Sequence, residues 1–360
     1  MQDKIKNKII TIGFVVILIA VFLINLIKED EQISTSERRK LAQFPELSIS
    51  KILTGEMTDK WEKYVEDQFI GRDLFRGIKS FWSAQIFAQK DNNKLFEKDN
   101  AIYKMEYPLN ENNIQKSAQK INEVYEKYLH DMNVYYSIIP EKNYYLQNDD
   151  HLKLDYDKVQ EIVNAELSGV RYIDIRSGLK LEDYYRTDLH WKQENLQDVV
   201  KIIQNNMGKE EKKIKYNLVD KGSFYGAYYG QLTANVTPDN LYVLTNETIE
   251  KCTTYNEETK KTTPVYVEPK SSDKYDIFVS GATPIIRIEN PNVQADNELL
   301  LFRDSFGSSL APLLVENYKK ITLIDLRYVS SKILDQYIDF KGQDVLFLYS
   351  TVVLNQNILK

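Results

Sequence analysis

Near its C-terminus the chain reads Leu299-Leu300-Leu301-Phe302-Arg303-Asp304-Ser305-Phe306-Gly307-Ser308-Ser309-Leu310-Ala311-Pro312. Four apolar residues without a turn former predict a buried strand, parallel and central in a sheet. The strand ends at Asp304 and Ser305, and small residues then lead into an apolar helical pattern. A serine in this position lies at the carboxyl end of a sheet, where the free N–H groups of a helix start can hold an oxyanion. Ser305 is therefore a candidate nucleophile; the alternative is that it only caps the helix.

Strand and helix patterns alternate through most of the remaining chain. Strands are expected at residues 101–103, 134–139, 171–175, 321–324 and 345–349, and helices at 113–132, 156–167 and 193–206. This alternation predicts an α/β fold with a parallel sheet and helices on both faces. Between residues 209 and 297 polar residues, glycine and proline dominate. Short β-type runs at 241–244, 264–267 and 285–288 predict an inserted β-rich region beside the sheet.

Composition excludes several classes of function. The chain has 360 residues and a net charge of -6 with both signs mixed, so it lacks the basic surface of a nucleic-acid-binding protein. Its single cysteine, Cys252, excludes an intrachain disulfide and a thiolate metal cluster. The three histidines are His130, His151 and His190, and none has a histidine neighbour with ligand spacing. No glycine-rich phosphate loop is recognisable, so we expect neither a metal nor a cofactor.

The N-terminal region predicts a membrane anchor. Residues 9–27 carry no charge and are about as long as a bilayer core requires. Lysines precede the segment and acidic residues follow it, which predicts a cytoplasmic tail over 1–8 and an exported remainder. A cleavable signal peptide is the alternative, but no Ala-x-Ala site follows. We expect a tether over 28–50 and one extracytoplasmic domain over 51–360, with the β-rich insertion at about 209–297.

A second motif lies over a hundred residues before Ser305, in Tyr185-Arg186-Thr187-Asp188-Leu189-His190-Trp191-Lys192. In extended backbone, residues two apart point to the same side, so the Asp188 carboxylate can accept from one imidazole nitrogen of His190 and leave the other free as a base. The alternative is a helix cap with a satisfied, partly buried histidine. Asp188, His190 and Ser305 together predict a triad of orienting acid, base and nucleophile at one edge of the sheet.

These two motifs carry a family resemblance. Thr187-Asp188-Leu189-His190-Trp191 with Phe302-Arg303-Asp304-Ser305-Phe306 resembles the SGNH-hydrolase-like proteins of the alginate O-acetyltransferase type, in particular the DHHW branch. The branch is named for Asp-His-His-Trp, and Leu189 stands at the second position here. The matching aspartate and histidine are the family's catalytic pair, and Ser305 aligns with its serine nucleophile. Further resembling blocks are Glu37 to Pro45, Pro140-Glu141-Lys142 and Asp325-Leu326-Arg327-Tyr328.

The resemblance implies an SGNH-like (flavodoxin-like) domain that acts as a membrane-tethered O-acyltransferase on a cell-surface polysaccharide. An acetyl group would pass through an acyl-enzyme on Ser305, and a membrane-bound O-acyltransferase would supply it from inside the cell. Arg327 is a weaker candidate for substrate or oxyanion contact, as are Tyr328 and Lys142. Two alternatives remain open: a glycan O-acetyl esterase that uses water as acceptor, and a catalytically silent glycan-binding or assembly protein.

Overall fold

The computed structural model describes residues 2–34, 39–46, 55–82, 91–210, 212–232, 236–269, 271, 273–281 and 283–360. It divides the chain into two compact units, residues 1–92 with 230–233 and residues 93–229 with 234–360. The helices of residues 55–82 thus fall in the first unit, whereas the sequence groups them with the sheet domain. Parts of the expected tether and of its Glu37 to Pro45 block, at 35–38 and 47–50, lie outside the described residues.

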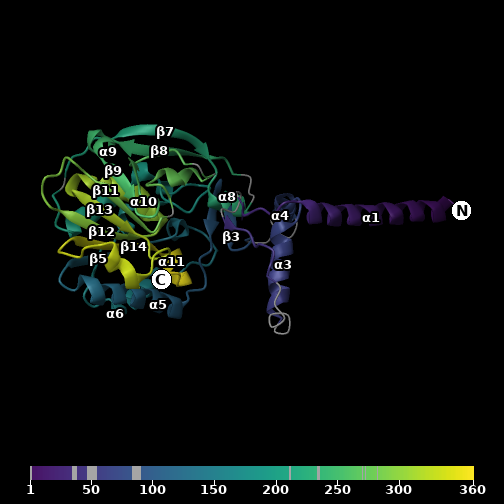
Figure 1. Ribbon diagram of the computed structural model, residues 1–360, viewed down its shortest axis with the longest axis horizontal. Helices are drawn as coiled ribbons and strands as arrows, with labels where there is room; N and C mark the ends of the chain where they lie inside the picture. The colour runs from purple at the N-terminus through teal and green to yellow at the C-terminus, as the bar shows by residue number, and fades with distance from the viewer. Residues whose placement is uncertain are drawn as a thin grey trace. The chain divides into compact units, whose positions relative to one another are not determined.

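An eight-stranded sheet forms the centre of the second unit, in the order β10-β9-β11-β13-β12-β14-β5-β6 (Figure 1). Its strands are β5 (Asn133–Ile139), β6 (Arg171–Tyr172), β9 (Thr253–Asn256), β10 (Lys261–Pro264), β11 (Ile285–Glu289), β12 (Glu298–Arg303), β13 (Lys320–Ile324) and β14 (Asp344–Ser350). The run from β13 to β6 is parallel throughout. The expected α/β fold is confirmed, and β12 has a parallel neighbour on each side, as its apolar sequence predicts.

The β-rich region differs from the expectation that it lies beside the sheet. Strands β9, β10 and β11 continue the sheet itself in antiparallel pairing, with β11 against β13. Among the described strands of this region, β7 (Asn217–Phe224) and β8 (Asp239–Thr245) form a separate pair. The short helix α8 (Ala227–Leu232) lies between them in sequence, and α9 (Glu247–Lys251) follows β8. The strand expected at 264–267 is wrong, because β10 ends at Pro264, a residue without an N–H, and Tyr266 makes only an isolated bridge to Phe278.

The strand expected at 101–103 exists as β4 (Ala101–Lys104), but it pairs with β3 (Leu95–Lys98) in a two-stranded hairpin outside the main sheet. A strand only a few residues away in the sequence can pair with a smaller loss of chain entropy than the distant edge of the main sheet. The strand expected at 171–175 is reduced to the two residues of β6.

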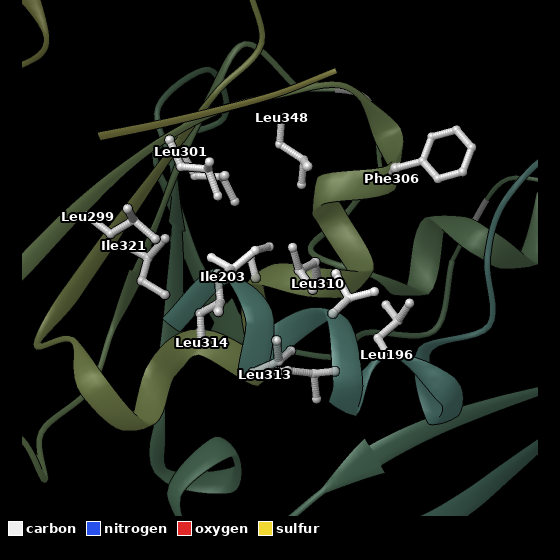
Figure 2. Packing of buried hydrophobic residues seen from close by; sticks show 14 of the residues in the cluster. Leu196, Ile203, Leu299, Leu301, Phe306, Leu310, Leu313, Leu314, Ile321 and Leu348 are labelled. Atoms are coloured by element: carbon white, nitrogen blue, oxygen red, sulfur yellow. The ribbon is translucent and has the colours of Figure 1, made fainter. Parts of the chain in front are cut away.

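Helices cover both faces of the sheet. Helices α5 (Glu111–Val124, continued by a π-helical turn over Tyr125–Leu129), α6 (Tyr156–Glu166) and α11 (Thr351–Gln356) pack on one face. Helices α7 (Gln197–Asn206) and α10 (Ser305–Leu314) pack on the other. Leu299 and Leu301 of β12 meet α7 and α10, as Figure 2 shows, while Leu300 and Phe302 belong to the opposite core. Burial on both faces explains why β12 is apolar at every position from 299 to 302.

The first unit contains α1 (Gln2–Ile27), the short strands β1 (Ile33–Ser34) and β2 (Arg39–Lys40), and helices α3 (Glu56–Gln68) and α4 (Arg72–Phe81). Within α1, Lys4–Ile27 is long and apolar enough to cross a membrane, with a mean hydropathy of 3.0 and no buried residue in its apolar window. This helix is therefore either a single-pass anchor or a signal sequence.

Candidate active site

The three residues of the expected triad lie in one chain of contacts. Nδ1 of His190 is 2.5 Å from Oδ1 of Asp188, and Nε2 of the same ring is 2.7 Å from Oγ of Ser305. Asp188 and His190 are buried, and Ser305 is partly exposed. The structure thus brings together two motifs separated by 115 positions. Their catalytic role is a proposal that is developed below.

Ser305 owes its position to Asp304, which ends β12 and caps α10. Oδ1 of Asp304 accepts a hydrogen bond from the N–H of Phe306 (3.0 Å), and its other oxygen accepts one from the N–H of Ser350 at the end of β14 (2.8 Å). The N–H of Gly307 donates to the Asp304 carbonyl (3.1 Å). Asp304 therefore engages the N–H groups of the second and third residues of α10. The sequence predicts that several N–H groups at this helix start contact an oxyanion. Of these groups, the N–H of Ser305 is the remaining candidate.

Both carboxylate oxygens of Asp188 are held by backbone donors. Oδ1 accepts from the N–H of His190 (3.0 Å), and Oδ2 accepts from the N–H of Ala227 (2.6 Å). The segment before Ala227 lies so close that a Cβ added to Gly226 would come within 2.5 Å of Oδ2 and 2.6 Å of Cα of Asp188. The sequence analysis missed Gly226 and Ala227, and the glycine in a tyrosine-rich segment is the only signal that could have pointed to them.

The plane of the His190 ring is fixed by an aromatic neighbour. The Tyr275 ring stacks on it, with centroids 3.8 Å apart and planes 9° apart. The Tyr275 hydroxyl donates to Oγ of Ser309 (2.8 Å), and the Trp191 indole N–H donates to the same atom (2.8 Å). Burial raises the pKa of Tyr275 well above its usual value, so the phenol stays neutral. Sequence reasoning missed Tyr275, because nothing distinguishes it among 25 tyrosines.

Lys142 has a structural role instead of the substrate contact that the sequence suggests. Its side chain is 1% exposed, and Nζ donates to the carbonyl oxygens of Tyr185 (2.7 Å), Arg186 (3.1 Å) and Asp188 (2.8 Å). An ammonium group has three donors, so these bonds use all of them. Burial lowers the pKa of Lys142 to about 8. Lys142 is a positioning residue that fastens the backbone of the loop carrying Asp188.

Replacing Lys142 with methionine keeps most of the side-chain volume and removes the Nζ donor from the buried carbonyls of Tyr185 and Asp188. The carbonyl of Arg186 still accepts from the N–H of Ile102 (2.8 Å). We expect Lys142→Met to lower the free energy of unfolding by about 3 kcal/mol or more, since each buried unsatisfied acceptor costs roughly 1–3 kcal/mol. Urea unfolding measures this change. A residue that touched only substrate would behave differently: the variant would raise KM and leave the unfolding curve in place.

Arg327 and Tyr328 follow β13 at the same edge of the sheet. Nε and Nη2 of Arg327 donate to the buried Asp325 carboxylate at 2.9 and 2.6 Å, and Nη1 of Arg303 lies 3.4 Å from the same group. Tyr328 is half-exposed, with its ring 5.3 Å from the Arg327 guanidinium carbon. These contacts anchor Arg327 on Asp325 and do not extend to the triad, so a substrate or oxyanion contact for either residue stays a prediction.

A buried carboxyl group lies near the start of α11. Glu106 accepts a 2.5 Å hydrogen bond from the Thr351 hydroxyl, and its other carboxyl oxygen is buried without a partner among the described residues. Burial raises its pKa from about 4.5 to about 8. The folded protein therefore holds a proton on Glu106 across a pH range in which the unfolded chain releases it.

This raised pKa predicts a pH dependence of stability. The contribution of protonated Glu106 is fully present below about pH 4.5 and is lost as the pH rises through about 8. Glutamine stays neutral at every pH. We therefore expect the free energy of unfolding to fall less with rising pH in Glu106→Gln than in the wild type, by on the order of a few kcal/mol. Thermal unfolding at about pH 5 and about pH 9 measures it, with Glu97→Gln on the exposed face of β3 as control. Parallel pH profiles for wild type and Glu106→Gln would contradict the assignment.

The other candidate groups have structural partners. His151 lies 3.0 Å from Asp149 and stacks on Phe96. Cys252 is buried, which raises its pKa to about 12 and leaves it a poor nucleophile. Across the part of the chain that the structure describes, no group of three or more His, Cys, Asp or Glu side chains could hold a metal ion. The expectation that the protein needs neither metal nor cofactor stays a prediction.

Comparison with known proteins bears on the region that contains all three triad residues. The DHHW protein family matches residues 152–324. No curated protein sequence matches the chain. A DHHW family protein from Eubacterium siraeum is 20% identical and superposes with a TM-score of 0.60 over 75% of this chain and 97% of its own. PatB1 from Bacillus cereus is 20% identical, with a TM-score of 0.58 over 73% of this chain and 97% of its own. These two proteins share the fold.

A more distant match is the O-acetyltransferase domain of Pseudomonas putida AlgJ, 12% identical with a TM-score of 0.44 over 72% of this chain and 90% of its own. The family match includes the Asp188 and His190 motif as well as the Ser305 motif, in the order in which the structure joins them. The resemblance to the DHHW proteins is thus confirmed over residues 152–324, which match that family.

Proposed function

We propose that the protein is an extracytoplasmic O-acyltransferase that acetylates a cell-surface polysaccharide through Asp188, His190 and Ser305. The observation that carries the proposal is the continuous contact from Asp188 through His190 to Ser305, at 2.5 and 2.7 Å. Such a chain of contacts is the arrangement that activates a serine hydroxyl. The acetyl group and the polysaccharide acceptor come from the resemblance of the two motifs to the alginate O-acetyltransferase type.

The triad geometry supports a two-step transfer. Oγ of Ser305 attacks the carbonyl carbon of an acetyl ester while Nε2 of His190 takes the hydroxyl proton. The tetrahedral intermediate expels the donor alcohol, which takes that proton from His190, and acetyl-Ser305 remains. A sugar hydroxyl then gives its proton to His190 and attacks the acetyl carbon. Oγ of Ser305 leaves with that proton, which restores the free enzyme and gives the acetylated sugar. Asp188 holds the proton on Nδ1 and stabilises the imidazolium that forms in each step.

The donor follows from the proposed location. If α1 anchors the chain with its lysine-flanked end in the cytoplasm, the triad works outside the membrane. Acetyl-CoA is confined to the cytoplasm, so the acetyl group must first cross the membrane. A membrane-bound O-acyltransferase is the partner that could deliver it to Ser305.

The two alternatives differ in what they require of the site. A silent binding protein has no need for a serine in contact with an oriented histidine, so the 2.7 Å distance supports an enzyme. A glycan esterase uses the same three residues with water as the acceptor, and only the exclusion of water from acetyl-Ser305 separates it from a transferase. The reaction product therefore decides between esterase and transferase.

The test uses the full-length protein purified in detergent. With p-nitrophenyl acetate we expect a burst of nitrophenolate and one acetyl group on the peptide containing Ser305, detected by mass spectrometry. Added oligosaccharides should then become acetylated. Free acetate with no acetylated sugar would favour the esterase, and a folded protein that forms no acetyl-serine would contradict the catalytic proposal.

A further inference from the structure

Helix α4 of the first unit exposes a row of large apolar side chains. The exposed fractions are 67% for Leu74, 56% for Phe75, 44% for Ile78 and 49% for Trp82, which caps the helix. Spacings of one, four and eight residues place these four side chains along one side of an α-helix. Asp73 and Arg76 fall on the opposite side, and Lys79 lies at the edge of the row, one turn after Phe75. We call the four apolar side chains the α4 apolar face.

The segment that leads into α4 is fastened to the end of α1. The N–H of Ile70, two residues before α4, donates to Oδ1 of Asn25 at 2.8 Å. Asn25 lies in the last turn of α1, about 3 Å along the axis from Ile27. α4 therefore begins at the level where the apolar helix ends.

Two further contacts hold the preceding helix α3 to the residues that follow α1. The Tyr64 hydroxyl donates to Oδ1 of Asp30 (3.0 Å). The Gln68 amide pairs with the backbone of Glu31 in both directions, each at 2.9 Å. Four groups spread over residues 64–70 are thus tied to residues 25–31. This leaves little freedom for α4 to move away from the end of α1.

We infer that the α4 apolar face lies in the interfacial layer of the same membrane that α1 anchors, in contact with phospholipid. The inference rests on the proposed anchoring by α1. An amphipathic helix lying at a bilayer surface buries its apolar side in the acyl boundary and keeps its polar side in water. Trp82 is the residue type enriched at that depth, and Lys79, at the edge of the row, is basic, as anionic headgroups favour.

A lipid surface fits this face better than a protein partner does, because of where the face begins. The Asn25 to Ile70 hydrogen bond places α4 beside the exit of α1 from the bilayer, where lipid headgroups are the nearest neighbours. The exposed side chains of α1 itself, such as Leu26 at 65% and Ile27 at 81%, already face the same environment. The α4 apolar face continues that surface.

The test uses full-length protein in vesicles of phosphatidylcholine with phosphatidylglycerol. Single cysteines are introduced as Leu74→Cys, Phe75→Cys and Ile78→Cys, with Asp73→Cys on the polar side as the matched control. Each carries a nitroxide label. The native Cys252 is 1% exposed, and the parent protein taken through the same labelling reports any signal from it. Electron paramagnetic resonance then compares collisions with oxygen, which enriches in lipid, and with a water-soluble nickel complex.

We expect a several-fold larger oxygen-to-nickel ratio at positions 74, 75 and 78 than at 73. Equal ratios on both sides of the helix would show that the face meets water, and low collision rates with both reagents would show a protein neighbour; either result overturns the inference. Val16→Cys in the middle of α1 reports on the anchor separately. None of these measurements depends on acyl transfer, so a failure of the proposed enzyme activity is distinguishable.

Discussion

Ser305→Ala is expected to abolish acetyl-enzyme formation and to lower turnover of p-nitrophenyl acetate by at least about 10³-fold. The substitution removes the Oγ that lies 2.7 Å from Nε2 of His190. The fold should survive, because α10 is capped by Asp304 and not by Ser305. Burst kinetics and intact-protein mass spectrometry measure the effect, and the unfolding temperature establishes that the variant is folded.

Ser308→Ala provides the matched control. Ser308 lies on the same helix one turn further along and is buried, so the substitution makes a similar change in volume and polarity. We expect this variant to keep the burst and the acetyl adduct. If Ser305→Ala retained the adduct, another nucleophile would have to carry the acetyl group, and the assignment of Ser305 would be wrong.

The strand and helix around Ser305 could be predicted because their causes are local. A strand buried on both faces must be apolar at each position, and Leu299 to Phe302 have that pattern; a helix that starts at a strand end needs a cap, and Asp304 supplies it. The pairing of Asp188 with His190 is equally local: the chain bends over residues 186–190, and Oδ1 of Asp188 meets both the N–H and Nδ1 of the residue two positions on. That Asp188 and His190 lie beside Ser305 could be predicted only because the carboxyl ends of parallel strands share one edge of the sheet.

The remaining parts of the site depend on contacts between distant segments. Gly226 and Ala227 meet Asp188 across 38 and 39 positions, and Tyr275 reaches His190 from the β-rich region. Neither the hydrophobic periodicity nor the secondary-structure propensity of these segments predicts that they come into contact. The same holds for β11, whose apolar sequence identifies a strand but does not say that it joins β13 antiparallel and enlarges the sheet. Lys142 was misassigned for this reason, because the three carbonyls that occupy it lie more than 40 positions away.

Gly226→Ala tests whether the distant support of Asp188 matters for catalysis. The added methyl group would lie 2.5 Å from Oδ2 of Asp188, closer than non-bonded atoms approach, so either the carboxylate or the 226–227 backbone must move. Movement of either breaks the 2.6 Å bond from the Ala227 N–H and turns Asp188 away from His190. Misplacement of the orienting acid costs roughly 10²- to 10⁴-fold in turnover. We expect a loss in that range in the p-nitrophenyl acetate assay.

The control for Gly226→Ala is Gly77→Ala, where a Cβ meets no heavy atom within 4 Å. That variant should keep wild-type turnover, since it adds the same methyl group to the same chain in open space. The unfolding temperature of Gly226→Ala separates a moved Asp188, which leaves the protein folded, from a general loss of fold. Full activity in Gly226→Ala would mean that the loop yields without moving Asp188, and the support that we assign to Gly226 and Ala227 would then be dispensable.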